Sequence, residues 1–150
     1  HAMDMVRLGI GLYGVSNQLS LKNVATLSTK ISKTRIVPAN EQIGYGVRNI
    51  TNSKIKLGII PIGYADGFSR NFGNGKAKVF VNGSLVPTVG KICMDMSFID
   101  LTEIEAKAGD SVEIFGANNA IQNIAKSVNT IPYEILSSIS QRVVRIYSED

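Results

Sequence analysis

The chain has 150 residues, of which 44% are hydrophobic and 19% charged, the balance of one globular domain with a core of its own. No apolar stretch reaches the about 18 residues that a membrane helix needs, the N-terminus lacks the layout of a signal peptide, and one cysteine excludes an internal disulfide. We therefore expect a soluble, cytoplasmic protein, although a membrane segment elsewhere in a longer parent stays open. The net charge of +4 is spread along the chain without a basic stripe, which argues against a nucleic-acid partner.

The first half of the chain is predicted to be rich in strands. Residues 5–14 are glycine-rich and begin abruptly, like the last strand and turn of a larger structure, and residues 1–3 read as a cloning remnant. Residues 24–37 alternate between apolar or β-branched and polar side chains up to Pro38, which predicts one long half-buried strand. Asn-Gly, Gly-Asn-Gly and Gly-Asp turns separate the strands that follow. These strands are expected over residues 54–60, 77–81, 84–89, 97–101 and 111–115.

The periodicity becomes helical after residue 115. A short helix is predicted from about residue 120, with Asn118 or Asn119 as its N-cap. A second short helix is predicted at Pro132, because proline is favoured in the first turn of a helix. Residues 142–147 are expected to form a closing strand. The fold class is therefore mainly β, a β-barrel or sandwich, with two short helices near the C-terminus.

Tyr64 is the most informative single residue. It lies in the sequence GYADG, directly after the strand expected over residues 54–60. Because Gly63 and Gly67 permit backbone angles that are closed to other residues, the phenol is placed for chemistry more than for packing. Taken alone, however, the local sequence favours a tyrosine packed on the rim of a barrel.

Other groups that could carry chemistry have plainer explanations. His1 and Cys93 are the only residues of their types, which excludes histidine-ligated metal, cysteine-ligated zinc and serine–histidine or cysteine–histidine pairs, and no metal site is expected. Cys93 is expected to be a small buried hydrophobic residue and not a nucleophile. Asp66 and Asp95 suggest paired carboxylates, but turn stabilisation explains them better. Residues 9–14 match the glycine spacing of a dinucleotide fingerprint without the helix and acidic residue that it requires.

Three segments together are specific where each alone is weak: residues 6–14 (VRLGIGLYG), 63–67 (GYADG) and 89–95 (VGKICMD). In this order and spacing they resemble bacterial alanine racemase, and the resemblance covers nearly the whole chain. It implies the C-terminal, β-barrel-like domain of a two-domain enzyme whose TIM-like barrel holds pyridoxal 5'-phosphate. Residues 1–14 would be the last strand and phosphate-binding turn of that barrel, and residues 15–150 the C-terminal domain.

The resemblance also implies what lies outside the chain. The lysine that forms the Schiff base with the cofactor belongs early in the barrel, so the isolated fragment is expected to be inactive. The whole enzyme would interconvert L-alanine and D-alanine for peptidoglycan precursors. It would be a homodimer, in which Tyr64 and Met94 serve the active site of the partner subunit.

The residue roles that the resemblance implies fit their chemistry. Racemisation needs a base on each face of the substrate, and Tyr64 resembles one of the two. Since a phenol has a reference pKa of about 10, we expect a cation beside it in the intact enzyme. Met94 matches the residue whose main chain meets the substrate. Arg7 matches the arginine that faces the pyridine nitrogen of the cofactor, and Gly9 and Ile10 match the positions whose backbone N–H groups bind its phosphate.

Gln141 departs from the family. A tyrosine that contacts the phosphate usually stands here, before Arg142, and an amide is shorter and more polar than a phenol. This puts the cofactor contact at residue 141 in doubt and favours, as an alternative, a racemase of serine-type or broader specificity. The alternative of another class is a non-catalytic β-barrel that binds RNA or protein, suggested by the pI of about 9.3 and the small size. Its sequence support is slight, because Val79-Phe80-Val81 between Lys78 and Asn82 is too little of the aromatic and basic interleaving that such binding uses.

Overall fold

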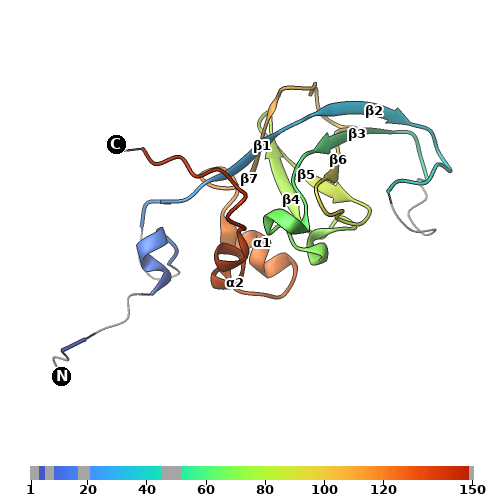
Figure 1. Ribbon diagram of the computed structural model, residues 1–150. Coiled ribbons are helices and arrows are strands. Elements are labelled where there is room, and N and C mark those ends of the chain that lie inside the picture. The colour runs from blue at the N-terminus through green and yellow to red at the C-terminus, as the bar shows by residue number, and fades with distance from the viewer. Residues whose placement is uncertain (1–3, 6–8, 17–20, 45–51, 149–150) are drawn as a thin grey trace.

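Alternating side chains and glycine-containing turns fold this chain into short antiparallel strands with helices beside them (Figure 1). The computed structural model describes residues 4–5, 9–16, 21–44 and 52–148. None of the helices in these ranges is long and apolar enough to cross a membrane. The strands are β1 (Leu27–Lys30), β2 (Lys33–Val37), β3 (Ile55–Ile60), β4 (Lys78–Val81), β5 (Ser84–Val89), β6 (Ser97–Asp100) and β7 (Ser111–Phe115). The helices are the 3-10 helices η1 (Ile10–Tyr13), η2 (Tyr64–Asp66) and η3 (Arg70–Phe72) and the α-helices α1 (Ile121–Ser127) and α2 (Pro132–Ser138).

The sheet curls toward closure. Its strand order is β1-β7-β4-β5-β6-β3-β2, and all neighbouring strands are antiparallel. The two strands at the ends of this order, β1 and β2, follow one another directly in the chain. The residues between them therefore join the two ends of the sheet, and Figure 1 shows β1 and β2 as one long curved segment. The prediction of a mainly β, barrel-like fold with two short C-terminal helices is confirmed.

One expected strand is two strands with different partners. At the junction of β1 and β2, the Ile31 N–H donates to the Asp110 carbonyl at 2.9 Å, beside β7. The next residue, Ser32, donates its N–H to the Ile59 carbonyl of β3 at 2.8 Å. The prediction of a single strand over residues 24–37 was therefore wrong. The alternation of side chains breaks at the junction, where Ser32 and Lys33 are two exposed polar residues in succession, but this break does not reveal which strand the chain pairs with next.

A tight hairpin joins β4 and β5, as its Asn-Gly sequence predicts. Asn82 and Gly83 have φ values of 46° and 88°, the left-handed region that two-residue hairpins require. The Asn82 side chain also donates to the Asp110 carboxylate at 2.8 Å, and the Lys107 N–H donates to the same carboxylate at 3.0 Å. The hydrogen bond from Asn82 is the main cause that lowers the pKa of the Asp110 carboxyl.

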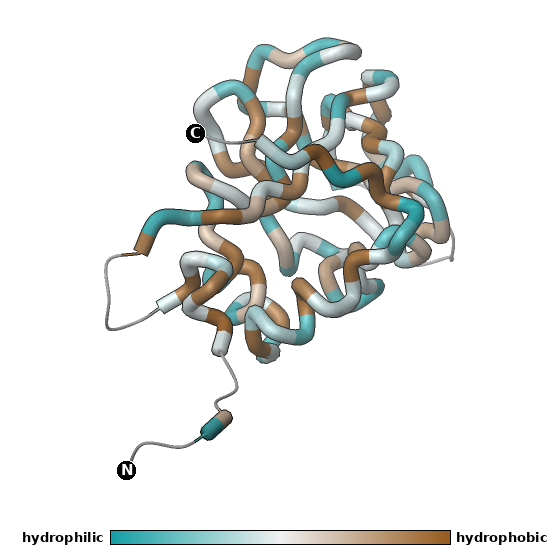
Figure 2. The backbone as a smooth tube through the Cα atoms, turned by 60° about the vertical axis from the view of Figure 1, so that its left-hand side comes forward, coloured by the Kyte–Doolittle hydropathy of each residue, from teal (hydrophilic) through white to brown (hydrophobic). Residues whose placement is uncertain are grey.

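Most buried side chains belong to one hydrophobic core between the sheet and the α-helices. Strands contribute fully buried aliphatic residues, α1 adds Ile121 and Ile124, and α2 adds Ile135. Figure 2 shows hydrophobic and hydrophilic residues alternating along the strands, as this one-sided burial requires. Central members of the core are Ile60, Val79, Ile99, Val112, Ile124 and Ile135, and a smaller cluster contains Val37, Ile43 and Leu57.

The start of α1 differs from its prediction. Its N-cap is Ala120, without a side-chain hydrogen bond to the helix. Asn119 is instead buried, and its amide donates to the Lys78 carbonyl at 2.9 Å and the Ile114 carbonyl at 2.7 Å. The prediction of Asn118 or Asn119 as N-cap was therefore wrong, because the buried amide satisfies two carbonyls of the sheet.

Near the two ends of the chain, the structure confirms one predicted element and contradicts another. The helix α2 begins with a proline, as predicted. Residues 144–148 form no strand, and Val144 and Ile146 are exposed. The closing strand expected over residues 142–147 was wrong, because β1 and β2 already occupy the ends of the sheet. The strand expected near the N-terminus falls partly on residues 6–8, which lie outside the described residues, and the helix η1 follows it.

Candidate active site

Tyr64 begins the 3-10 helix η2 in the turn that follows β3. Gly67, after η2, has a φ of 101°, so the prediction of a special backbone angle is confirmed there. Gly63 has a φ of −143°, which is extended backbone open to any residue, and the prediction for it was wrong. Gly63 is needed for another reason. A Cβ atom at this position would lie 2.2 Å from the Met94 carbonyl oxygen and 2.4 Å from that of Cys93.

This close approach brings two predicted site residues together. The Tyr64 N–H donates to the Cys93 carbonyl and the Ala65 N–H to the Met94 carbonyl, both at 3.0 Å. Tyr64 is 42% exposed and Met94 53% exposed. The backbones of Tyr64 and Met94 therefore lie side by side in two exposed turns, held by hydrogen bonds that do not depend on side-chain identity.

Gln141 lies in a turn that is attached to the same helix. The Ser140 N–H donates to the Asp66 carbonyl of η2 at 3.1 Å, and the Val143 N–H donates back to the Ser140 carbonyl at 3.2 Å. Gln141 is exposed within this turn. The structure thus anchors the segment that carries Gln141 to the helix that carries Tyr64.

Gly9 and Ile10 lie elsewhere. The Ile10 N–H donates to the Tyr133 hydroxyl of α2 at 3.0 Å, and a Cβ at Gly9 would lie 3.2 Å from the same oxygen. In Figure 1 the blue helix η1, which Ile10 begins, lies on one side of α2 and the green helix η2 on the other. Arg7 falls outside the described residues. Within one chain, the helix η1 is therefore not brought to the helix η2 (Figure 1).

Burial raises the pKa of the Cys93 thiol, and the positive charge of Arg70 opposes this shift in part. A raised pKa keeps the thiol protonated near neutral pH, so Cys93 is a poor nucleophile despite its place beside Met94. The prediction that it does not act as a nucleophile agrees with these surroundings.

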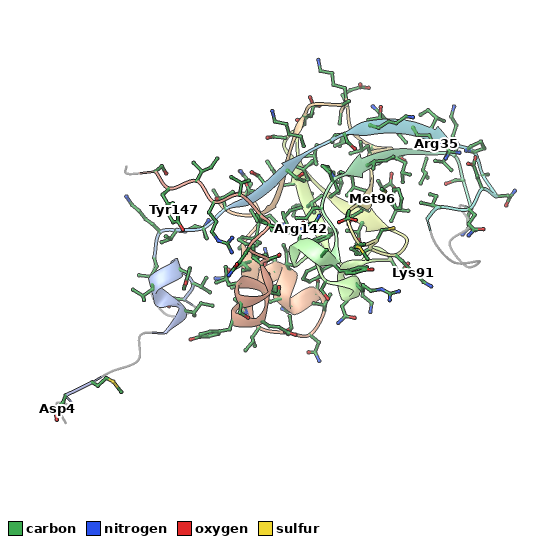
Figure 3. All side chains as sticks on the ribbon, in the orientation of Figure 1. Asp4, Arg35, Lys91, Met96, Arg142 and Tyr147 are labelled. Atoms are coloured by element: carbon green, nitrogen blue, oxygen red, sulfur yellow. The ribbon has the colours of Figure 1, made fainter. Side chains whose placement is uncertain are left out.

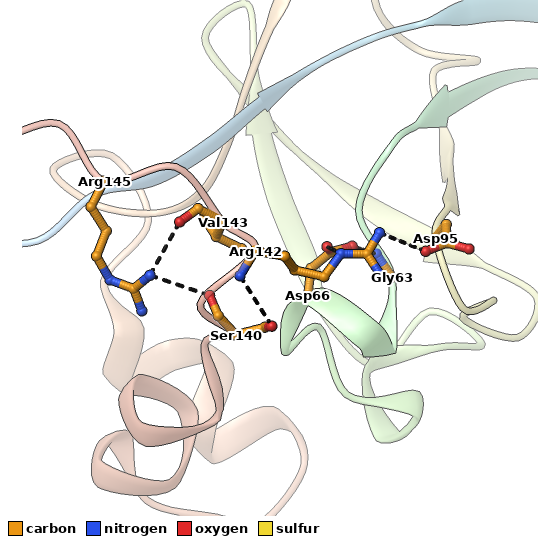
Figure 4. Close-up of polar contacts among 7 residues, drawn as sticks. All are labelled: Gly63, Asp66, Asp95, Ser140, Arg142, Val143 and Arg145. Atoms are coloured by element: carbon orange, nitrogen blue, oxygen red, sulfur yellow. Dashed lines mark hydrogen bonds and ion pairs between the residues drawn. The ribbon is translucent and has the colours of Figure 1, made fainter.

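No functional role was predicted for Arg142, whose guanidinium contacts the carboxylates of Asp66 and Asp95 (Figure 4). Figure 3 shows Arg142 between the C-terminal segment and the loop that carries Met96. Asp66 also accepts a hydrogen bond from the Gly63 N–H at 2.8 Å, which is the turn-stabilising role predicted for it. The signal in the sequence was only that Arg142 follows Gln141.

The fold and these turns define a mainly β domain in which Tyr64 and Met94 are exposed in two adjoining turns. The model of the family described as "Alanine racemase, C-terminal domain" matches residues 24–147. The chain therefore belongs to the alanine racemase family and is its C-terminal domain, as the three sequence segments predicted.

Similar proteins agree in sequence and in fold. The chain is 42% identical over 158 residues to an alanine racemase of Helicobacter pylori, covering 97% of this chain and 41% of that protein. It matches the crystal structure of alanine racemase from D-cycloserine-producing Streptomyces lavendulae with a TM-score of 0.90 at 36% identity, over 98% of this chain and 41% of that one. It also matches the Bartonella henselae alanine racemase with covalently bound pyridoxal phosphate, with a TM-score of 0.87 at 36% identity, over 93% and 40% of the two chains. The chain thus spans about two fifths of the length of these relatives.

Proposed function

We propose that the chain is the C-terminal part of a longer enzyme that interconverts L-alanine and D-alanine, and that it supplies Tyr64 as one of two bases. The observation that carries the proposal is the pair of hydrogen bonds from Tyr64 and Ala65 to the carbonyls of Cys93 and Met94. They hold the backbone of Tyr64 beside the main chain of Met94, which meets the substrate in the family resemblance. Positioning of this kind supplies a large part of the rate of proton transfer.

Tyr64 would move a proton at one face of the α-carbon. It accepts the proton from one enantiomer and returns it when the other enantiomer reacts, while the opposite face needs a second base. The lysine expected in the preceding barrel domain is the candidate for that base. Arg142 is already paired with two carboxylates, so the cation expected beside the Tyr64 phenol stays a prediction for the intact enzyme.

Pyridoxal phosphate would supply the electron sink that stabilises the deprotonated α-carbon. The chain contains a backbone donor of the kind that binds phosphate, the Ile10 N–H, which here donates to the Tyr133 hydroxyl and would exchange this oxygen for one of the phosphate. Gly9 leaves little room there for a side chain. We assign Gly9 and Ile10 to the phosphate, Arg7 to the pyridine ring and Gln141 to a contact on the cofactor that is weaker than the family tyrosine would make. Residues 1–14 would belong to the barrel domain and residues 15–150 to the C-terminal domain.

A homodimer with a shared active site is part of the proposal. The helix η1, where Ile10 lies, and the helix η2, where Tyr64 lies, are on different sides of α2 within one chain (Figure 1). One copy therefore does not bring the phosphate-binding turn to the phenol, and a second copy could complete the site. The open surface around Tyr64 and Met94 would be covered by that second subunit.

We also place the enzyme in the cytoplasm, supplying D-alanine for peptidoglycan precursors. A single cysteine fits a reducing compartment, in which proteins rarely rely on disulfides.

The test of this function is an assay of the full-length protein. With pyridoxal phosphate, it should interconvert the two alanine enantiomers, whereas the 150-residue chain alone should show no activity, because the Schiff-base lysine is expected outside it. The proposal fails if the reading frame holds no barrel-sized domain with an early lysine, or if the full-length protein racemises no amino acid when the cofactor is present. Binding of polyanions that weakens steeply with salt would favour a nucleic-acid module instead.

The preference between alanine and serine is expected to depend on Gln141. An amide can pair with a serine hydroxyl, whereas a tyrosine would fill the same space with an apolar ring. Gln141→Tyr in the full-length enzyme should lower the ratio of kcat/KM for serine to that for alanine by about tenfold. Gln122→Tyr on α1 makes the same change away from the turn and should leave the ratio as it was. An unchanged ratio in Gln141→Tyr would refute a role of this residue in specificity.

A further inference from the structure

A single guanidinium joins the two turns that carry Tyr64 and Met94. The Arg142 Nε lies 3.1 Å from Asp66 Oδ1, and one Nη lies 2.8 Å from Asp95 Oδ1 (Figure 4). These two carboxylates belong to different loops, and they contact different nitrogen atoms of the same planar guanidinium. Arg142 is therefore a bridge between the loops and not a partner of one of them.

Both contacts are made next to the residues that matter for chemistry. Asp66 ends the helix that Tyr64 begins, and its second carboxylate oxygen accepts the Gly63 N–H at 2.8 Å. Asp95 directly follows Met94 in the chain. The guanidinium thus links the two turns at Asp66 and Asp95. The backbone hydrogen bonds from Tyr64 and Ala65 link the same two turns at Cys93 and Met94.

Arg142 itself belongs to the third turn. Arg142 follows Gln141, and the Ser140 N–H before it donates to the Asp66 carbonyl at 3.1 Å. Three segments that lie far apart in sequence therefore meet at one side chain. Without the guanidinium, two carboxylates that now share one cation would face each other and repel.

The bridge is suited to orientation more than to stability. The Arg142 side chain is 52% exposed, that of Asp95 is 53% exposed, and only that of Asp66, at 13%, is well covered. Ion pairs that are this exposed contribute little to the stability of folding. A lysine would keep the charge but lose the planar fork that reaches two carboxylates at once.

We propose that Arg142 is a positioning residue for racemisation, which holds the Tyr64 phenol and the Met94 main chain in one fixed relation by bridging Asp66 and Asp95. The proposal rests on the proposed function, because it assigns Arg142 a part in the proton transfer that Tyr64 performs. Arg142 acts through the two turns and does not itself touch the substrate.

The kinetic test uses the full-length enzyme. Arg142→Ala should lower kcat by about 10- to 100-fold, since small displacements of reacting groups are costly, and Arg142→Lys should recover part of the loss. The control is Arg145→Ala, which removes a guanidinium that contacts only the backbone carbonyls of Ile139, Ser140 and Val143 among the described residues. It should keep most of the activity.

Isotope effects separate positioning from a loss of folded enzyme. If the step at Tyr64 becomes slower, the α-deuterium effect should rise for the enantiomer from which Tyr64 takes the proton and fall for the other enantiomer. A smaller folded fraction would lower both rates and leave both isotope effects unchanged. Equal isotope effects in Arg142→Ala and the unmodified enzyme would overturn the proposal.

Amide hydrogen exchange tests the bridge independently of activity. In Arg142→Ala, the amides of Tyr64 and Ala65, which donate to the neighbouring loop, should exchange at least tenfold faster, and in Arg145→Ala they should not. Unchanged exchange in Arg142→Ala would overturn the bridging role even in an active enzyme. An unmodified full-length protein without racemase activity would overturn the proposed function instead, and exchange would still decide whether Arg142 holds the two turns.

Discussion

Tyr64→Phe in the full-length protein is expected to lower racemisation by about 10²- to 10⁴-fold in both directions, which is the contribution of a positioned general acid or base. Both directions must fall together, because the phenol accepts the proton from one enantiomer in one direction and returns a proton to form that same enantiomer in the reverse direction. The change removes a single oxygen atom from a side chain that is 42% exposed, so the fold should not be affected. Racemisation of alanine in each direction, followed with a chiral assay, measures the effect.

A second tyrosine provides the matched control. Tyr147 is exposed in the C-terminal segment and has no part in the turns around Tyr64, so Tyr147→Phe removes the same hydroxyl without touching the proposed site. Its activity should stay near that of the unmodified enzyme. Full activity of Tyr64→Phe would show that Tyr64 only packs on the rim of the barrel, as the local sequence alone had favoured.

Much of the fold could be predicted from the sequence, because its signals are local. Side-chain alternation marked the strands, and the pair Asn82-Gly83 marked a hairpin that the two positive φ values confirm. The choice of strand partners is not local. The switch after Ile31, from the residues beside β7 to β3, is marked only by two successive exposed polar residues, Ser32 and Lys33, and β-forming residues on both sides of them suggested one strand in place of two.

The candidate site divides in the same way. Tyr64 could be found because glycines flank it and because the segment resembles a known family, whereas Arg142 could not. Its partner Asp95 lies 47 residues away in the sequence, and no spacing rule joins two residues so far apart. Gly63 was recognised as important for the wrong reason. Its backbone angle is open to any residue, and glycine is needed because the Met94 and Cys93 carbonyls leave no room for a Cβ atom.

Gly63→Ala is expected to have the second largest effect, because a methyl group there would collide with backbone and not with a movable side chain. The nearest atoms would be carbonyl oxygens of Met94 and Cys93, at 2.2 and 2.4 Å. The loops must separate to admit the methyl group, and that movement breaks the hydrogen bonds from Tyr64 and Ala65. We expect a loss of about 3 kcal/mol in the free energy of unfolding and a loss of activity close to that of Tyr64→Phe.

Gly83→Ala separates this collision from the general cost of replacing a glycine. Gly83 has a φ of 88° and nothing within 4 Å of an added Cβ, so alanine there strains only the backbone. This strain should cost about 1 kcal/mol and leave kcat unchanged. Urea unfolding and alanine racemisation of the two full-length variants measure both quantities. If Gly63→Ala kept full activity, the close contact of the two turns could not be what positions Tyr64, and the phenol would have to be oriented from outside this chain.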